Sequence, residues 1–112
     1  MSKINIETSL KKNNIEDINL KTQGILQDGR IKYKEDKIMN ILDIEKEMLE
    51  RKTEEYKLLI DFKNEKLITE YLDINLSIIE KQKEQNKIKI RYKIEEDIFE
   101  YKIIWRESWK RI

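Results

Sequence analysis

Five tyrosines, two phenylalanines and two tryptophans are the side chains best suited to contacting a small molecule, because the chain contains neither histidine nor cysteine. An aromatic ring offers a large apolar surface, and a phenol hydroxyl can orient a ligand inside an apolar pocket. The aromatic residues that would line such a pocket are Tyr33, Tyr56, Phe62, Tyr71, Tyr92, Phe99, Tyr101 and Trp105. The simpler interpretation is that these residues fill the interior as ordinary core.

Arg51 and Glu35 could add an ionic contact to the same pocket. Both stand beside apolar positions, so they could project inward as a buried charge pair or bind an anionic head group. A solvated pair with nothing bound is the simpler interpretation here too. The candidate ligand-binding residues are Tyr33, Glu35, Arg51, Tyr71, Tyr92 and Tyr101.

The missing residue types argue against an enzyme. Without imidazole or thiol groups, histidine-containing triads, most zinc sites and thiolate nucleophiles are excluded. Two glycines cannot form a glycine-rich phosphate loop. Asp43, Glu45 and Glu47 could offer oxygen ligands to a hard cation, but they lack calcium-loop spacing. We therefore expect no catalytic residue, no cofactor and no metal site.

A stripe of basic residues, Lys87, Lys89, Arg91 and Lys93, could contact the phosphates of a nucleic acid. The formal net charge is only +1, however, so no overall field attracts nucleic acid or an anionic membrane. A charged outer face is also the usual means of keeping a sheet soluble. Nucleic-acid binding is therefore the weaker third option.

The elements expected to position these residues are strands. Between Lys87 and Trp105, apolar and charged residues alternate, which is the pattern of a strand with one exposed face. A turn centred on Glu96 and Asp97 would place all the large apolar side chains on one face of a hairpin. The expected pairs are Ile94 with Phe99, Tyr92 with Tyr101, Ile90 with Ile103 and Ile88 with Trp105. A one-residue slip would scatter that face, so the pattern determines the parity of the pairing.

The strongest hairpin signal is Asp28-Gly29, because this dipeptide tolerates the positive φ angles of a type I′ turn. It predicts that Leu26 faces Ile31 and that Gly24 faces Tyr33. Glycine inside a strand indicates a bulge or a close backbone approach. A second turn at residues 64–65 is expected to pair Phe62 with Leu67, Ile60 with Thr69 and Leu58 with Tyr71.

The middle of the chain is ambiguous. Apolar residues from Ile38 to Ile60 have near-helical spacing among many Glu, Lys and Leu residues, which favours a helical hairpin over residues 35–85. The strict alternation from Tyr56 to Phe62 and the polar turn after it favour strands instead. We therefore predict an all-β, antiparallel, up-and-down barrel of lipocalin-like type with roughly eight to ten strands, large enough to hold side chains or one small ligand.

The chain has the length of a single domain, residues 1–112, with residues 107–112 as a possible flexible tail. No segment is long and apolar enough to span a bilayer, and the N-terminal residues lack the apolar core of a signal peptide. A cytoplasmic location is expected. The abundance of Ile, Lys, Asn and Glu is typical of proteins from an AT-rich bacterial genome.

The order of features resembles the YwiB-like family of small bacterial proteins of unknown function, which form calycin-type β-barrels. The resemblance is carried by Thr22-Gln23-Gly24, Asp28-Gly29, Tyr33-Lys34-Glu35, Met48-Leu49-Glu50-Arg51, Leu59-Ile60-Asp61-Phe62, Thr69-Glu70-Tyr71, residues 87–94 and residues 99–105. Lys52-Thr53 departs from the pattern, because a glycine-containing turn is expected there. The resemblance implies a calycin-like barrel and no particular activity.

These observations predict non-catalytic binding of a small apolar or amphipathic ligand. The alternative is a protein-interaction module, such as a homodimer that uses the barrel rim or an exposed strand. A cavity of ligand size would favour the first role, whereas a fully packed interior with a large exposed apolar patch would favour the second.

Overall fold

A computed structural model describes residues 1–107, and within them all regular structure is β. The strands are β1 (Ser2–Lys12), β2 (Ile15–Gln27), β3 (Arg30–Glu35), β4 (Ile38–Asp43), β5 (Met48–Lys52), β6 (Lys57–Asp61), β7 (Lys66–Ile68), β8 (Asp73–Asn75), β9 (Ser77–Glu84), β10 (Lys87–Ile94) and β11 (Asp97–Glu107). The predicted all-β fold is confirmed, and the helical alternative is wrong. Of the predicted tail, Glu107 ends β11 and residues 108–112 lie outside the described part. No helix long and apolar enough to cross a membrane occurs in residues 1–107.

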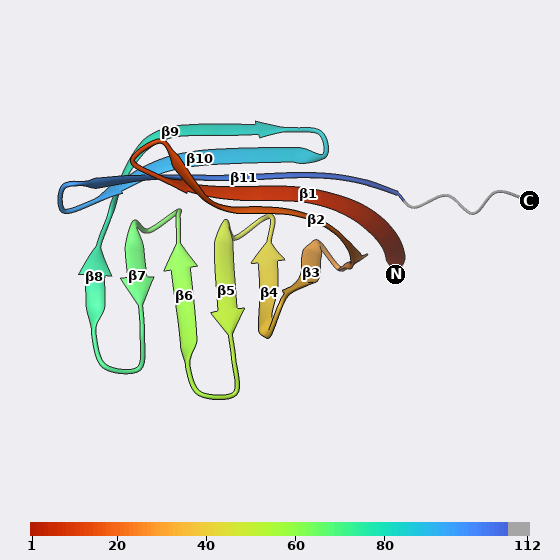
Figure 1. The fold of residues 1–112 in the computed structure, drawn as a ribbon, viewed down its shortest axis with the longest axis horizontal. Helices are drawn as coiled ribbons and strands as arrows, with labels where there is room; N and C mark the ends of the chain where they lie inside the picture. Colours follow the sequence, from red (N-terminus) through yellow and green to blue (C-terminus); the bar gives the residue numbers. More distant parts are fainter. Residues whose placement is uncertain (108–112) are drawn as a thin grey trace, which may run out of the picture.

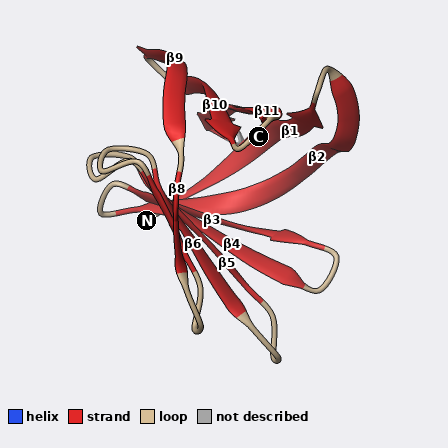
Figure 2. Ribbon diagram, turned by 90° about the vertical axis from the view of Figure 1, so that its left-hand side faces the viewer, coloured by secondary structure: helices blue, strands red, loops and turns tan. Residues whose placement is uncertain are grey.

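The strands form one antiparallel sheet in which neighbours follow the chain order and β1 also pairs with β11. In Figure 1, β4 to β8 cross beneath β9, β10, β11 and β1, and Figure 2 shows the two groups as separate layers. The sheet ends at β8 on one side and at β9 on the other. Only Leu76 separates these two strands, so one continuous segment reaches both edges and the sheet curls into a nearly closed barrel.

Eleven strands are present, which makes the expected eight to ten too few. Part of the difference lies at Leu76, where the chain passes from β8, which pairs with β7, to β9, which pairs with β10. Glu65 holds this crossing. Its backbone oxygen accepts a hydrogen bond from the Leu76 N–H at 3.1 Å, and its Oε1 accepts one from the Ile78 N–H at 3.0 Å.

β2 belongs to both layers. It pairs with β1 along nearly its whole length but with β3 only from Gly24 to Gln27. A Cβ atom built on Gly24 would overlap the Lys32 carbonyl oxygen and the Ile6 Cδ1 atom. The expected close backbone approach at Gly24 is therefore confirmed, and glycine is required where β2 changes layer.

The three predicted hairpins have different outcomes. Asp28 and Gly29 adopt φ angles of 52° and 74°, and Gly24 pairs with Tyr33 as expected. The C-terminal turn lies at residues 95–96, so Tyr92 pairs with Phe99 and not with Tyr101. In the middle hairpin the partner of Leu67 is Ile60, not Phe62. Both errors are slips of two residues, which leave the residues within the strands on their predicted faces.

The interior is built from alternate residues of these strands. Fifteen hydrophobic side chains are buried in one cluster, and Ile4, Ile31, Phe62 and Ile103 are completely inaccessible. On β3 to β8, one inward-facing set runs straight across the layer. We call it the aliphatic row; its members, joined pair by pair, are Ile31, Leu42, Leu49, Ile60, Leu67 and Ile74.

Candidate functional site

A second inward-facing set lies two residues along the same strands and contains polar side chains. Tyr33 of β3 pairs with Asn40 of β4, and Asn40 pairs with Arg51 of β5. We call these three residues the polar row. Because residues two apart in a strand share a face, the polar row points into the barrel beside the aliphatic row.

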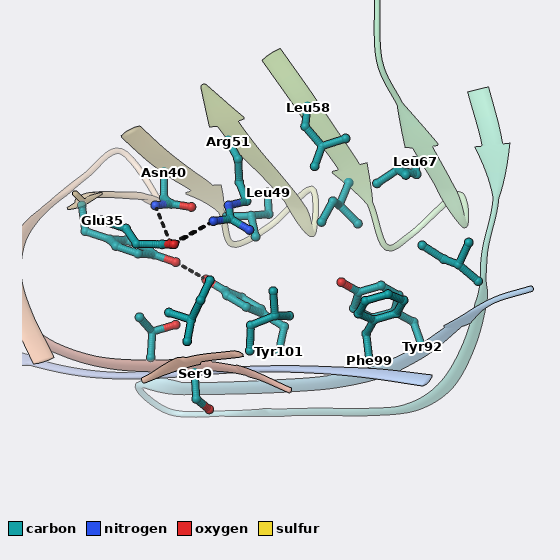
Figure 3. A pocket seen from close by; sticks show the side chains of 16 residues that line it. Ser9, Glu35, Asn40, Leu49, Arg51, Leu58, Leu67, Tyr92, Phe99 and Tyr101 are labelled. Atoms are coloured by element: carbon teal, nitrogen blue, oxygen red, sulfur yellow. Dashed lines mark hydrogen bonds and ion pairs between the residues drawn. The ribbon is translucent and has the colours of Figure 1, made fainter. Parts of the chain in front are cut away.

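A cavity of about 230 Å³ lies between the polar row and the opposite layer. Figure 3 shows Arg51, Leu58 and Leu67 projecting into it from one layer, and Tyr92 and Tyr101 from the other. Most of its lining is aliphatic or aromatic. The half-buried side chains among the lining residues include Leu10, Ile18, Ile94 and Phe99.

Arg51 and Glu35 form an ion pair at the edge of this cavity. The Arg51 Nη2 atom donates to both carboxylate oxygens of Glu35, at 3.0 and 2.9 Å. Each side chain is 17% exposed, so the pair is largely removed from solvent. Asn40, which is 1% exposed, also donates to Glu35, at the longer distance of 3.5 Å. Breaking such a pair from one side would leave a charge with little solvation.

The guanidinium group is only partly satisfied by this pairing. Arg51 Nε is the one fully buried side-chain N or O atom without a hydrogen-bond partner in residues 1–107. Buried donors are normally paired, so an unpaired one calls for a reason such as a functional role. The Arg51 guanidinium therefore keeps one donor that no described protein group uses.

Three phenols complete the polar surroundings. The Tyr33 and Tyr101 hydroxyls are 2.9 Å apart and join β3 to β11. Burial raises the pKa of Tyr33 and raises that of Tyr101 well above the ordinary phenol value. Burial also raises the pKa of Tyr92 to about 12, against the opposing effect of the Arg51 charge. All three phenols keep their protons at neutral pH and can act as donors.

Aromatic packing holds the Tyr92 ring in place. Its centroid lies 5.4 Å from that of Phe62 in an edge-on arrangement and 5.3 Å from that of Phe99 in a stacked one. Phe62 also stacks on Tyr101 at 6.2 Å. Such contacts restrict the ring, so the Tyr92 hydroxyl has a defined position in the cavity.

The structure brings five of the six sequence-predicted site residues to the cavity: Tyr33, Glu35, Arg51, Tyr92 and Tyr101. Tyr71 lies elsewhere, in the turn between β7 and β8, with 89% of its surface exposed. The Thr69 hydroxyl accepts hydrogen bonds from the N–H groups of Tyr71 and Leu72, which ends the strand and carries Tyr71 outward.

Sequence reasoning missed Asn40. It is in phase with Leu42 on β4, which would mark it as an inward-facing polar residue, but the helix-like spacing of its neighbours hid this alternation. The basic stripe on β10 faces outward, where Arg91 lies 3.9 Å from both Glu80 and Glu100. Within residues 1–107, no group of three acidic side chains is placed to hold a metal ion.

Comparison with known proteins adds no identification: no family model matches the chain, and no curated protein or solved structure matches it either.

Proposed function

We propose that this protein binds a small, mainly apolar molecule in the cavity between its two layers and performs no chemistry on it. The observation that carries the proposal is the cavity of about 230 Å³ with its largely apolar lining. An apolar cavity of about 150 Å³ accommodates benzene, so this volume suits a molecule of roughly nine non-hydrogen atoms.

Kinship with the YwiB-like family, and a calycin-type assignment of the barrel, belong to the same proposal. They are supported by the all-β barrel and by the strand that leads from Gly24 through the Asp28-Gly29 turn to Tyr33. Neither suggests a particular ligand. The alternative, a protein-interaction role, would use the edge strand β9, where Ile79 is exposed, or the exposed Tyr71 in the turn between β7 and β8. These side chains lie on separate elements, so we favour ligand binding in the cavity.

Filling the cavity tests the proposal. Leu58 points into the cavity, whereas Leu59, the next residue of β6, points to the opposite face of the sheet. The Leu58→Trp variant should fill the space with its own indole ring. Titration calorimetry with cumene, an apolar probe of about nine non-hydrogen atoms, should then show binding to the wild type and none to Leu58→Trp.

The matched control is Leu59→Trp, which adds the same side chain outside the cavity and should leave cumene binding intact. Circular dichroism would establish that both variants keep the β-rich spectrum of the wild type. Equal binding of cumene to Leu58→Trp and the wild type, or no binding to the wild type, would overturn the proposal.

A further inference from the structure

The polar end of the cavity is rich in donors. The Arg51 guanidinium can only donate, the Asn40 amide both donates and accepts, and each of the three phenols is held in its protonated form and so carries a proton to donate. The Glu35 carboxylate, the strongest acceptor nearby, is already occupied by three hydrogen bonds from Arg51 and Asn40. A molecule bound there would therefore be recognised through an acceptor atom of its own.

One donor is both accessible and unused. The Tyr92 hydroxyl makes no hydrogen bond within residues 1–107, yet it is not among the fully buried unpaired atoms of this part of the chain. The Tyr92 side chain lines the cavity, so its remaining accessible surface faces that space. Figure 3 shows the Tyr92 phenol directed into the space between the two layers, at the end of the cavity where Leu67 projects from the other layer.

The charges at this end are already balanced. Arg51 is neutralised by Glu35 at 2.9 Å, and the cavity lining contains no other charged residue. A carboxylate ligand would place a second negative group beside Glu35 with only one cation for both, and a buried charge without its own partner is costly. A carbonyl oxygen brings two lone pairs and no charge, so it meets the donors without that cost.

We propose that the cavity selects a neutral molecule bearing a carbonyl-type acceptor oxygen, held by the Tyr92 hydroxyl, over the corresponding carboxylate. This inference rests on the proposed binding function and specifies the class of ligand. Small ketones, esters, lactones and amides with an apolar body belong to that class.

Three probes of nearly equal shape separate the possibilities: cumene, acetophenone and benzoate, which place an isopropyl, an acetyl and a carboxylate group on the same ring. Calorimetric titration of the intact protein should show acetophenone binding about tenfold more tightly than cumene, the gain of one net hydrogen bond. Benzoate should bind more weakly than acetophenone. If cumene binds but acetophenone binds no more tightly, this inference fails while the proposed function stands.

Removing the Tyr92 hydroxyl provides a second test of the proposed hydrogen bond. In Tyr92→Phe the ring contacts with Phe62 and Phe99 are retained, and the ratio of acetophenone to cumene affinity should fall by about tenfold. Tyr71→Phe removes an equivalent hydroxyl from an exposed turn and should leave the ratio unchanged. Tightest binding by benzoate, or a ratio unaffected in Tyr92→Phe, would overturn the assignment of a neutral acceptor at Tyr92.

Discussion

The aliphatic row and the polar row occupy the same strands and the same face of the sheet, two residues apart, yet they have different neighbours. Ile31 and Leu42 of the aliphatic row are 0% and 1% exposed and pack into the continuous core, whereas Leu49, farther along the row, also reaches the cavity. Arg51 and Asn40 of the polar row meet Glu35, and every member of the polar row borders the cavity. We infer that the aliphatic row holds the two layers together where it is fully packed and that the polar row keeps room between them.

This difference has a physical basis. Aliphatic side chains from two layers interdigitate because every contact removes apolar surface from water. A charge pair gains little from such contacts, because the hydrogen bonds between its two groups must be kept. A core that includes Arg51 and Glu35 therefore does not close completely around them.

The largest expected effect comes from breaking the aliphatic row. Leu42→Ala should lower the free energy of unfolding by about 3 to 4 kcal/mol, because it removes a fully buried side chain and leaves a cavity. Urea denaturation would measure the change. Leu59→Ala, on the opposite face of β6, should cost about 1 kcal/mol. Equal losses in the two variants would show that the aliphatic row has no special role.

The stability lost on disrupting the polar row should depend on whether one or both members of the Arg51–Glu35 ion pair are replaced. Arg51→Met alone should cost about 3 kcal/mol, because it leaves the Glu35 carboxylate largely buried without its cation. Adding Glu35→Gln should recover most of this loss, since the double variant contains no unpaired charge. Urea denaturation of both would give the difference, and a double variant as unstable as Arg51→Met would contradict the account of Glu35 as a stranded charge.

The two hairpins with clear sequence patterns show how much of the fold could be predicted. Alternation identified the faces in both, because side-chain direction has a period of two. Only Asp28-Gly29 also gave the register, since its positive φ angles specify a two-residue turn. At residues 95–96 the turn is formed by two glutamates, with Glu95 at a φ angle of 56°. Glutamate is not a typical residue for such a turn, so the predicted register of this hairpin was wrong by two residues.

The site shows a similar division. Inward direction could be predicted for Tyr33, Tyr92 and Tyr101, because each is in phase with buried neighbours in its strand. For Arg51 and Glu35 the sequence left a buried charge pair as one of several alternatives, because no local pattern shows that β5 and β3 lie on either side of β4. The cavity volume depends on how side chains from both layers fit together, which only the three-dimensional arrangement determines.

The smallest effect at neutral pH, and the most specific one, concerns Tyr92. Its hydroxyl has no protein partner within residues 1–107, so Tyr92→Phe should change the free energy of unfolding at pH 7 by less than about 0.5 kcal/mol. At high pH the variant and the wild type should diverge. Burial raises the pKa of Tyr92 to about 12 in the folded protein, whereas an unfolded phenol ionises near pH 10.

The sign of this divergence follows from proton binding. Above about pH 10 the unfolded chain has released the phenol proton that folded Tyr92 still holds, so rising pH favours unfolding until Tyr92 itself ionises near pH 12. Urea denaturation at several pH values should therefore show a shallower alkaline loss for Tyr92→Phe than for the wild type. Leu42→Ala carries no titratable change and should parallel the wild type at a lower stability. A Tyr92→Phe curve that also runs parallel would mean that the Tyr92 phenol is not held in a dry environment, which would contradict the apolar character of the cavity that the polar row borders.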